Sequence, residues 1–217
     1  GYYNMDLTSP RTIRNIQEQF GFTFKKGLGQ NFLTARNILE EIVDAAEIES
    51  GVIEVGPGFG VLTSELAQNS DKVVTIEIDE RLIDVLDYTL AEYDNVKIIN
   101  EDILKLDLKK VIDDEFNGEK VSIAANLPYY ITTPIITKLL EEKLPIKNIV
   151  VMVQKEVAER MSAKPSTKDY GAITVLCQYY TEPSIVANVP ASLFVPPPKV
   201  DSAVLKLKVL DKPSVEV

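Results

Sequence analysis

The sequence predicts an α/β protein with a mostly parallel seven-stranded sheet and an antiparallel edge pair of strands. Short apolar runs alternate with amphipathic helical segments along most of the chain, and this order requires crossover connections between parallel strands. Glycine, an acidic residue or proline follows successive apolar runs, which indicates where the strands end. Near the end of the chain, apolar residues alternate with Lys206 and Lys208, as in a strand with one exposed face.

The individual elements follow from the periodicity of the apolar residues. Strands are expected at residues 52–55, 73–76, 96–99, 121–125, 149–153, 185–189 and 200–209. Helices are expected near residues 10–20, 38–43, 61–67, 80–91, 108–114, 155–161 and 172–180, and after Thr132. The segment 172–180 is compatible with a strand as well, but its pattern favours a helix.

Three of these helices carry a start signal. Pro10 suits the first turn of the first helix, because its missing N–H would have no partner there. Thr34 is expected to cap the second helix with its hydroxyl. Thr132 or Thr133 is expected to cap the helix after the fourth strand, with Pro134 in its first turn.

Composition restricts the class of protein. The chain has 217 residues, of which 45% are hydrophobic, enough for one large α/β domain with a sizeable core. It has one cysteine and no histidine, so a disulfide framework, a hydrolytic triad and a zinc or other metal site are not expected. No apolar run approaches the length of a membrane span, and no secretory leader is visible. These features predict a cytoplasmic protein without a membrane partner.

Charge is unevenly distributed along the chain. The net charge is −10, which by itself argues against a nucleic-acid partner. Residues 37–120 carry 22 acidic and 7 basic residues, whereas residues 1–36 carry 2 and 5 and residues 121–217 carry 9 and 11. This asymmetry permits a basic face beside an acidic body. Scattered surface lysines are the ordinary alternative.

The stretch Asn126-Leu127-Pro128-Tyr129 follows the fourth predicted strand, at the edge of the sheet where α/β proteins bind ligands. The Asn126 carboxamide and a carbonyl next to Pro128 can each accept a hydrogen bond from one amino group. Tyr129 can stack on a flat ring. An exocyclic purine amine becomes nucleophilic when its N–H bonds are held out of the ring plane, so the stretch favours amine methylation of a base.

A glycine-rich loop, Gly56-Pro57-Gly58-Phe59-Gly60, follows the first predicted strand. Val61 occupies the place where a dinucleotide fingerprint has its third glycine, so a pyrophosphate site is disfavoured. Glu77 ends the next strand ~20 residues further on, where it can accept hydrogen bonds from two ribose hydroxyls. Asp102 ends the third strand and can accept from an adenine amine. Each carboxylate taken singly can equally be a solvated charge; together with the loop they favour a nucleoside cofactor without pyrophosphate.

These motifs resemble, in order, those of the small-subunit (16S) ribosomal RNA adenine dimethyltransferase family, also described as rRNA adenine N-6-methyltransferases. The resemblance runs from about Lys25 to Leu207. It rests on residues 29–33, 54–58, 126–129, 154–156 and 194–203, together with Glu77 and Asp102. It implies a class I S-adenosylmethionine-dependent methyltransferase of Rossmann-like fold. The implied reaction dimethylates the N6 amine of two adjacent adenines near the 3′ end of small-subunit rRNA, a step of ribosome biogenesis.

The resemblance also implies roles for individual residues. The catalytic residues it implies are Asn126, Leu127, Pro128, Tyr129 and Phe194, with Tyr129 and Phe194 on opposite faces of the target adenine. The cofactor-binding residues are Asn31, Leu33, Gly56, Gly58, Glu77, Asp102 and Asn126. For Phe194, core packing is the ordinary alternative. For the segment around Asn31, the ordinary alternative is a linker into the next helix.

The domain organisation expected from the resemblance has two parts. Residues 1–36 form an N-terminal helix and a basic segment that covers the cofactor, and residues 37–217 form the Rossmann-like catalytic domain. Family members usually continue into a small helical C-terminal domain, which is expected to be absent here because the chain ends at Val217. We expect a monomer that acts on ribosomal RNA of the small subunit.

Three other functions are compatible with parts of the pattern. The first is a 23S rRNA adenine N6-methyltransferase of the kind that confers macrolide resistance, which shares the architecture. The second is a ribosome-assembly factor on the same fold that needs no catalysis, although the intact stretch 126–129 argues against it. The third is a nicotinamide-dependent dehydrogenase, which the glycine spacing disfavours.

Overall fold

The computed structural model describes residues 5–21, 31–164 and 171–214, without the side chain of Tyr129. Its strands are β1 (Phe32–Leu33), β2 (Gly51–Val55), β3 (Lys72–Ile76), β4 (Val96–Ile99), β5 (Val121–Asn126), β6 (Ile146–Gln154), β7 (Thr181–Val189), β8 (Phe194–Val195) and β9 (Ser202–Val209). Its helices are α1 (Pro10–Phe20), α2 (Arg36–Ala46), α3 (Val61–Gln68), α4 (Arg81–Thr89), α5 (Leu108–Phe116), α6 (Tyr129–Glu141), α7 (Lys155–Met161) and α8 (Ala172–Tyr180), with a 3-10 turn, η1, at Ala191–Leu193.

The main sheet has seven strands in the order β4-β3-β2-β5-β6-β9-β7. Strands β4, β3, β2, β5 and β6 are parallel to their neighbours. Strand β9 runs antiparallel to both β6 and β7. The predicted mostly parallel sheet with an antiparallel edge pair is therefore confirmed, and so is the helix at 172–180.

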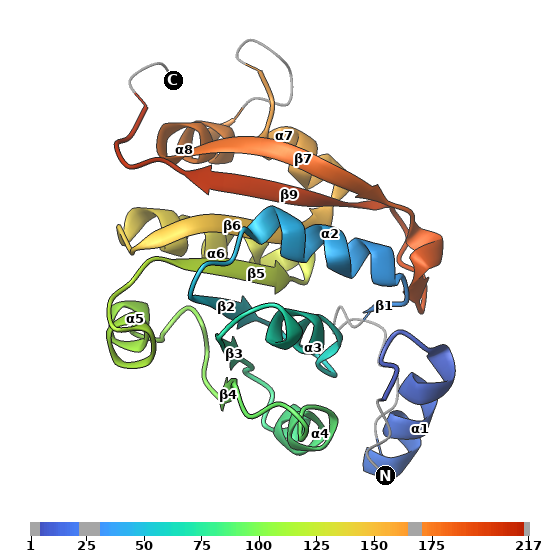
Figure 1. Ribbon diagram of the computed structural model, residues 1–217. Coiled ribbons are helices and arrows are strands. Elements are labelled where there is room, and N and C mark those ends of the chain that lie inside the picture. The colour runs from blue at the N-terminus through green and yellow to red at the C-terminus, as the bar shows by residue number, and fades with distance from the viewer. Residues whose placement is uncertain (1–4, 22–30, 165–170, 215–217) are drawn as a thin grey trace.

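Helices cover both faces of this sheet (Figure 1), because alternate strand residues point to opposite faces. On one face, α2 and α3 pack against a buried cluster that includes Val52, Val73 and Val150. On the other face, α5, α6, α7 and α8 pack against a cluster that includes Ile53 and Ile123. Burial on both faces explains why the central strands are continuously apolar rather than alternating.

Two predicted helix starts are wrong. Thr34 does not cap α2, which begins at Arg36 with Ala35 in the N-cap position; the Thr34 hydroxyl instead donates to the carbonyl of Leu193, with the two oxygens 2.7 Å apart. The sequence around Thr34 contains a capping signal, but it cannot show that Thr34 bonds to a segment 159 residues away while Ala35 takes the N-cap position.

Helix α6 also begins earlier than predicted, at Tyr129 directly after Pro128. Neither Thr132 nor Thr133 caps it, and Pro134 lies inside the helix rather than in its first turn. Thr132 donates its hydroxyl to the carbonyl of Pro128 at 3.2 Å. Proline inside a helix removes one backbone hydrogen bond, and burial of apolar side chains on the turns that follow offsets this loss: Ile135, Ile136, Leu139 and Leu140.

The N-terminal part is held against the sheet domain mainly by apolar contacts. Helix α1 contributes Ile13 and Ile16 to a buried cluster that also contains Phe32, Phe59 and Leu82. Phe32 packs on Phe59 of the glycine-rich loop, with ring centroids 4.5 Å apart. The segment before α2 and the loop after β2 are therefore in direct contact.

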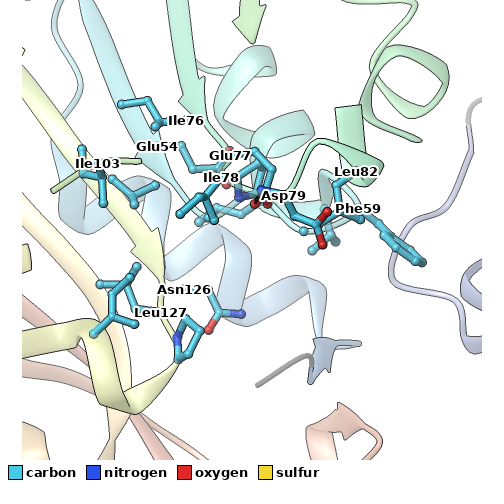
Figure 2. A pocket seen from close by; sticks show the side chains of 18 of the residues that line it. Glu54, Phe59, Ile76, Glu77, Ile78, Asp79, Leu82, Ile103, Asn126 and Leu127 are labelled. Atoms are coloured by element: carbon cyan, nitrogen blue, oxygen red, sulfur yellow. Dashed lines mark hydrogen bonds between the residues drawn. The ribbon is translucent and has the colours of Figure 1, made fainter. Parts of the chain in front are cut away.

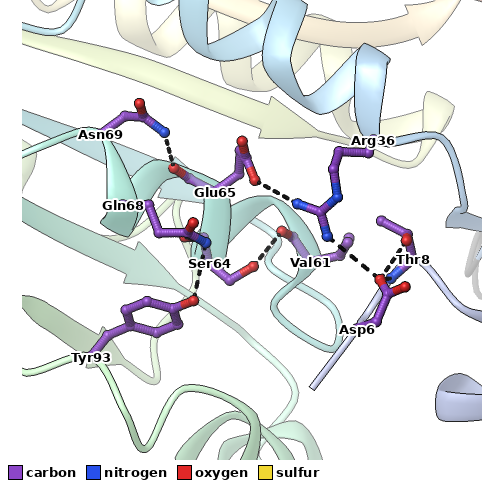
Figure 3. A network of polar contacts seen from close by, with 9 residues as sticks. All are labelled: Asp6, Thr8, Arg36, Val61, Ser64, Glu65, Gln68, Asn69 and Tyr93. Atoms are coloured by element: carbon purple, nitrogen blue, oxygen red, sulfur yellow. Dashed lines mark hydrogen bonds and ion pairs between the residues drawn. The ribbon is translucent and has the colours of Figure 1, made fainter. Parts of the chain in front are cut away.

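A polar network adds to this attachment (Figure 3). Arg36, at the start of α2, pairs with Glu65 on α3 at 3.1 Å and with Asp6 at 3.5 Å. Asp6 also accepts a hydrogen bond from the backbone N–H of Thr8. The Arg36 side chain is 51% exposed in both pairs, and ion pairs at the surface are worth at most about 1 kcal/mol, so the network sets the path of the N-terminal segment more than its stability.

Candidate active site

The carboxyl ends of four parallel strands, β2, β3, β4 and β5, meet at one edge of the sheet. A cavity of about 230 Å³ lies there. Its lining includes nine of the residues singled out in the sequence: Asn31, Leu33, Gly56, Gly58, Glu77, Asp102, Asn126, Leu127 and Pro128. The strand-end residues that the sequence pattern placed at one edge do lie around one cavity.

Figure 2 shows the two sides of this cavity, with Glu77 and Ile78 on one side and Asn126 and Leu127 on the other. The glycine-rich loop follows β2, which is the strand between β3 and β5. The loop therefore lies between these two sides of the cavity. Gly56 and Gly58 have φ angles of 72° and 57°, in the left-handed region that strains other residues. An added Cβ at Gly56 would lie 3.6 Å from the backbone oxygen of Asn126, so the loop closely approaches the end of β5.

Asn126 ends β5 and is half-buried. Its carboxamide makes no hydrogen bond with any residue in the described part of the chain. Because the side chain borders the cavity, both its acceptor oxygen and its donor nitrogen are available to a ligand. Pro128 follows two residues later and starts α6 from an extended conformation, with φ −58° and ψ 144°.

Glu77 ends β3 and is 6% exposed. The backbone N–H of Asp79 donates to its Oε2 at 3.0 Å, and Asn100 donates to its backbone carbonyl at 2.8 Å. Burial raises the pKa of the Glu77 carboxyl, against the lowering effect of backbone hydrogen bonds from Asp79 and Gly58. Hydrogen bonds from Asp79, Gly58 and Asn100 therefore fix the conformation of Glu77.

Asp102 lies just after β4, and its carboxylate accepts from the backbone N–H of Leu104 at 3.0 Å. This contact leaves other lone pairs of the carboxylate available at the cavity. Ile103 beside it is buried and lines the cavity, while Ile78 on the facing side is 64% exposed and also lines it. Neither isoleucine was among the predicted site residues, because the local sequence does not show that the residue after a strand-end acid faces the cavity.

Phe194 and Tyr129 are the two predicted site residues that are not among the described residues lining the larger cavity. Phe194 is 4% exposed and belongs to the core cluster of α2 and α3. It lines a second cavity of about 30 Å³, whose lining also includes Asn31, Asn126 and Pro128. The side chain of Tyr129 lies outside the described residues, as do residues 22–30, which include Lys25 and the beginning of the Gly-Gln-Asn-Phe-Leu motif.

Glu54 is a further residue that the sequence reasoning did not assign. It is fully buried in β2, lines the larger cavity, and accepts hydrogen bonds from the hydroxyls of Thr63 on α3 and Thr75 on β3, the latter at 2.8 Å. Burial raises its pKa to about 7, although these hydrogen bonds lower it, and the nearby Glu77 carboxylate raises it further. One carboxyl group thus joins three elements beneath the glycine-rich loop.

The titration of Glu54 predicts a pH dependence of stability. Between its ordinary pKa of 4.5 and the folded-state value of about 7, the folded protein holds a proton that the unfolded chain has lost. The free energy of unfolding therefore falls as pH rises through this window. Compared with the Glu54→Gln variant, which does not titrate there, the wild-type protein should lose about 2–3 kcal/mol from about pH 5 to about pH 8.

Urea unfolding of both proteins at several pH values measures this difference. Glutamine keeps an oxygen that can accept from Thr63 and Thr75, so the variant should be the more stable protein above the window. If the two stability curves stay parallel across the window, Glu54 does not titrate as described.

Two features are absent from the described residues. In the described ranges, no group of three or more acidic or cysteine side chains is arranged to hold a metal ion. No helix among the described residues has the length and apolar character that crossing a membrane requires.

Comparison with known proteins gives consistent matches. The family model described as ribosomal RNA adenine dimethylase matches residues 21–217. A protein of Alkaliphilus oremlandii named ribosomal RNA small subunit methyltransferase A is 53% identical over 213 residues, which cover 97% of this chain and 74% of that protein. A Bacillus mycoides protein of the same name is 55% identical over 215 residues, covering 98% and 74%. The chain therefore spans about three quarters of the length of these relatives.

Solved structures of rRNA methyltransferases and related enzymes superpose on this chain. A dimethyladenosine transferase from Plasmodium falciparum superposes with a TM-score of 0.72 at 36% identity, covering 82% of this chain and 63% of that one. The 23S rRNA methyltransferase ErmE superposes with a TM-score of 0.71 at 33% identity, covering 86% and 73%. The expected class I methyltransferase fold is confirmed.

Proposed function

Because the chain belongs to the ribosomal RNA adenine dimethylase family, we propose that it dimethylates the N6 amine of two adjacent adenines near the 3′ end of small-subunit rRNA, with S-adenosyl-L-methionine as the cofactor. The observation that carries this proposal is the set of groups that meet where four parallel strands end. There, a glycine-rich loop and two carboxylates border the same cavity as the Asn126 carboxamide, which has no partner among the described residues.

The residues that line the larger cavity fit this cofactor. Glu77 is held so that its carboxylate can accept from both ribose hydroxyls, and Asp102 can accept from the adenine amine. The apolar side chains of Ile78 and Ile103 suit the faces of a purine ring. Gly56 and Gly58 let the backbone approach the amino-acid end, and Asn31 and Leu33 border the same cavity from the N-terminal side. When bound, the cofactor supplies a methyl group activated by a positively charged sulfur.

The target amine is held by the end of β5. The Asn126 oxygen and the Leu127 carbonyl, next to Pro128, accept one N–H each and hold both bonds out of the ring plane. This arrangement localises the nitrogen lone pair on the amine. No general base is needed, because the amine becomes acidic once it has gained a methyl group and loses one proton to water for each methyl gained. Orientation of this kind can supply roughly 7–11 kcal/mol of a barrier.

Tyr129 and Phe194 are proposed to stack on the two faces of the target adenine. Stacking on an aromatic side chain is worth roughly 1–3 kcal/mol per base, which offsets much of the cost of taking the base out of its stack. In this proposal, residues 1–36 cover the cofactor and residues 37–217 form the catalytic domain. The expected partner is the small ribosomal subunit, met in the cytoplasm by a monomer.

Methylation of 23S rRNA is the second candidate function. It is favoured by the superposition on ErmE, whose TM-score nearly equals that of the dimethyladenosine transferase. The small-subunit assignment is preferred because the relatives at 53–55% identity carry the small-subunit name. A purely non-catalytic assembly factor would not need the Asn126 carboxamide at the cavity.

The test is transfer of radiolabelled methyl from S-adenosyl-L-methionine to small subunits that lack this modification, with large subunits in parallel. We expect label on the small-subunit rRNA, as N6,N6-dimethyladenosine after digestion. Label on large subunits alone would transfer the assignment to the 23S reaction. Absence of label from both particles, with the cofactor still bound, would overturn the proposed activity of this chain.

A further inference from the structure

A two-stranded antiparallel pair, which the sequence did not predict, joins the N-terminal segment to the segment before β9. Phe32 of β1 pairs with Val195 of β8, and Leu33 pairs with Phe194. Thr34 extends this ladder with two hydrogen bonds to one acceptor. Its backbone N–H and its hydroxyl donate to the carbonyl of Leu193 at 2.8 and 2.7 Å.

This pair lies between the two cavities of the site. On the β1 side, Asn31, Phe32 and Leu33 line the larger cavity. On the β8 side, Phe194 lines the smaller one, and Asn31 lines both. Leu33 and Phe194 are 1% and 4% exposed and belong to the same buried cluster. A displacement of β1 would therefore alter the smaller cavity, and a displacement of β8 would alter the larger one.

The smaller cavity lies where β5 and β6 end. Its volume is about 30 Å³. Two of its walls belong to the main sheet, at the ends of β5 and β6. The third wall is the segment 190–201, which carries Phe194 and Pro198. The β1–β8 pair, Thr34 and a hydrogen bond from Ala191 to Asp201 at 2.9 Å hold that segment.

We propose that Thr34 is a positioning residue whose paired hydrogen bonds to Leu193 couple cofactor binding at the β1 side to adenine binding at the β8 side. A cofactor that contacts Asn31 and Leu33 restricts the movement of β1. Through its hydrogen bonds to Leu193, Thr34 then restricts the movement of the segment that carries Phe194. Thr34 itself lines neither cavity among the residues described. The inference rests on the proposed function, because it takes the two cavities to be the cofactor site and the base site.

Coupling of this kind is reciprocal, so it can be measured from either side. The measured quantity is the dissociation constant of S-adenosyl-L-homocysteine, once for the protein alone and once for the protein bound to small subunits that lack the modification. The ratio of the two constants is the coupling factor. S-adenosyl-L-homocysteine is the probe because it carries no methyl group, so no turnover disturbs the titration.

For the wild-type protein we expect a coupling factor of about 5 or more, as is usual for coupled sites. Thr34→Val keeps the shape of the side chain but removes the hydroxyl donor. It should lower the coupling factor by at least about twofold toward 1, because one ordinary hydrogen bond supplies a factor of roughly 2 to 12. The affinity of the protein alone for S-adenosyl-L-homocysteine should change by less than about twofold, because no lining residue is altered. Thr34→Ser, which restores the donor, should restore the coupling.

Thr181→Val is the matched control. The buried Thr181 hydroxyl also donates to a backbone carbonyl, that of Cys177 at 2.6 Å, but at the start of β7. This variant should lose stability and keep the wild-type coupling factor. The inference is overturned if Thr34→Val keeps the wild-type factor, if Thr181→Val loses as much, or if the wild-type protein shows no coupling. Failure of the proposed function is seen separately, as absence of methyl transfer by the wild-type protein.

Discussion

Replacing Asn126 by alanine should lower the rate of methyl transfer to small-subunit rRNA by roughly 10²–10³-fold, the usual cost of losing one preorganised polar group at a reacting centre. The Asn126 carboxamide has no partner among the described residues, so its removal leaves none of their polar groups unpaired. The loss should therefore fall on kcat, and the folded structure should be retained.

Single-turnover methylation with labelled cofactor measures this effect, and sedimentation with small subunits measures particle binding separately. Binding should be preserved. Asn69→Ala is the control, because Asn69 caps a surface helix by donating to the carbonyl of Glu65 at 2.8 Å, away from the cavity. A variant at Asn126 that methylates at the wild-type rate would show that the amine is held by other groups.

Replacing Glu77 by alanine should weaken binding of S-adenosyl-L-methionine by about 3 kcal/mol or more, roughly 150-fold. Each hydrogen bond to a charged group contributes about 1.5–3 kcal/mol, and Glu77 is placed to make two to the ribose. The carboxylate is 6% exposed, so little solvent screens these bonds. Glu77→Gln should show a smaller loss, because the amide keeps one acceptor oxygen but has no charge.

Isothermal titration of the cofactor into each variant gives the dissociation constants. Glu80→Ala is the matched control, since Glu80 is an exposed carboxylate three residues further on, at the start of α4. It should bind the cofactor like the wild-type protein. Equal affinities for Glu77→Ala and the wild-type protein would remove Glu77 from the cofactor site.

Much of the cavity could be predicted because it is built from strand ends. Glu77, Asp102 and Asn126 each follow an apolar run, and the carboxyl ends of parallel strands meet at one edge. The isoleucines after the two acids and the buried Glu54 were missed. Local sequence gives no sign that Ile78 lines a cavity while 64% exposed, or that Glu54 receives hydroxyls from both α3 and β3.

The errors at helix starts have the same cause. A cap forms when the hydroxyl oxygen of the residue just before a helix accepts from a backbone N–H of the first turn. Thr34 lies one residue before the N-cap position of α2 and donates its hydroxyl to the carbonyl of Leu193. Thr132 lies inside a helix that already begins at Tyr129, and it donates to the carbonyl of Pro128. Pro134 within this helix is tolerated because buried side chains follow it, which the chain alone cannot show.

By itself, the sequence determined the alternation of strands and helices, the mostly parallel sheet and the residues at each strand end. These depend on the apolar period and on glycine and proline, which act over a few residues. Only the tertiary structure decided that β1 pairs with β8, that Thr34 bonds to Leu193, and that Phe194 lies in the core beside a second cavity. The reason is physical: these contacts join segments about 160 residues apart, and their formation depends on how the whole sheet and its helices pack.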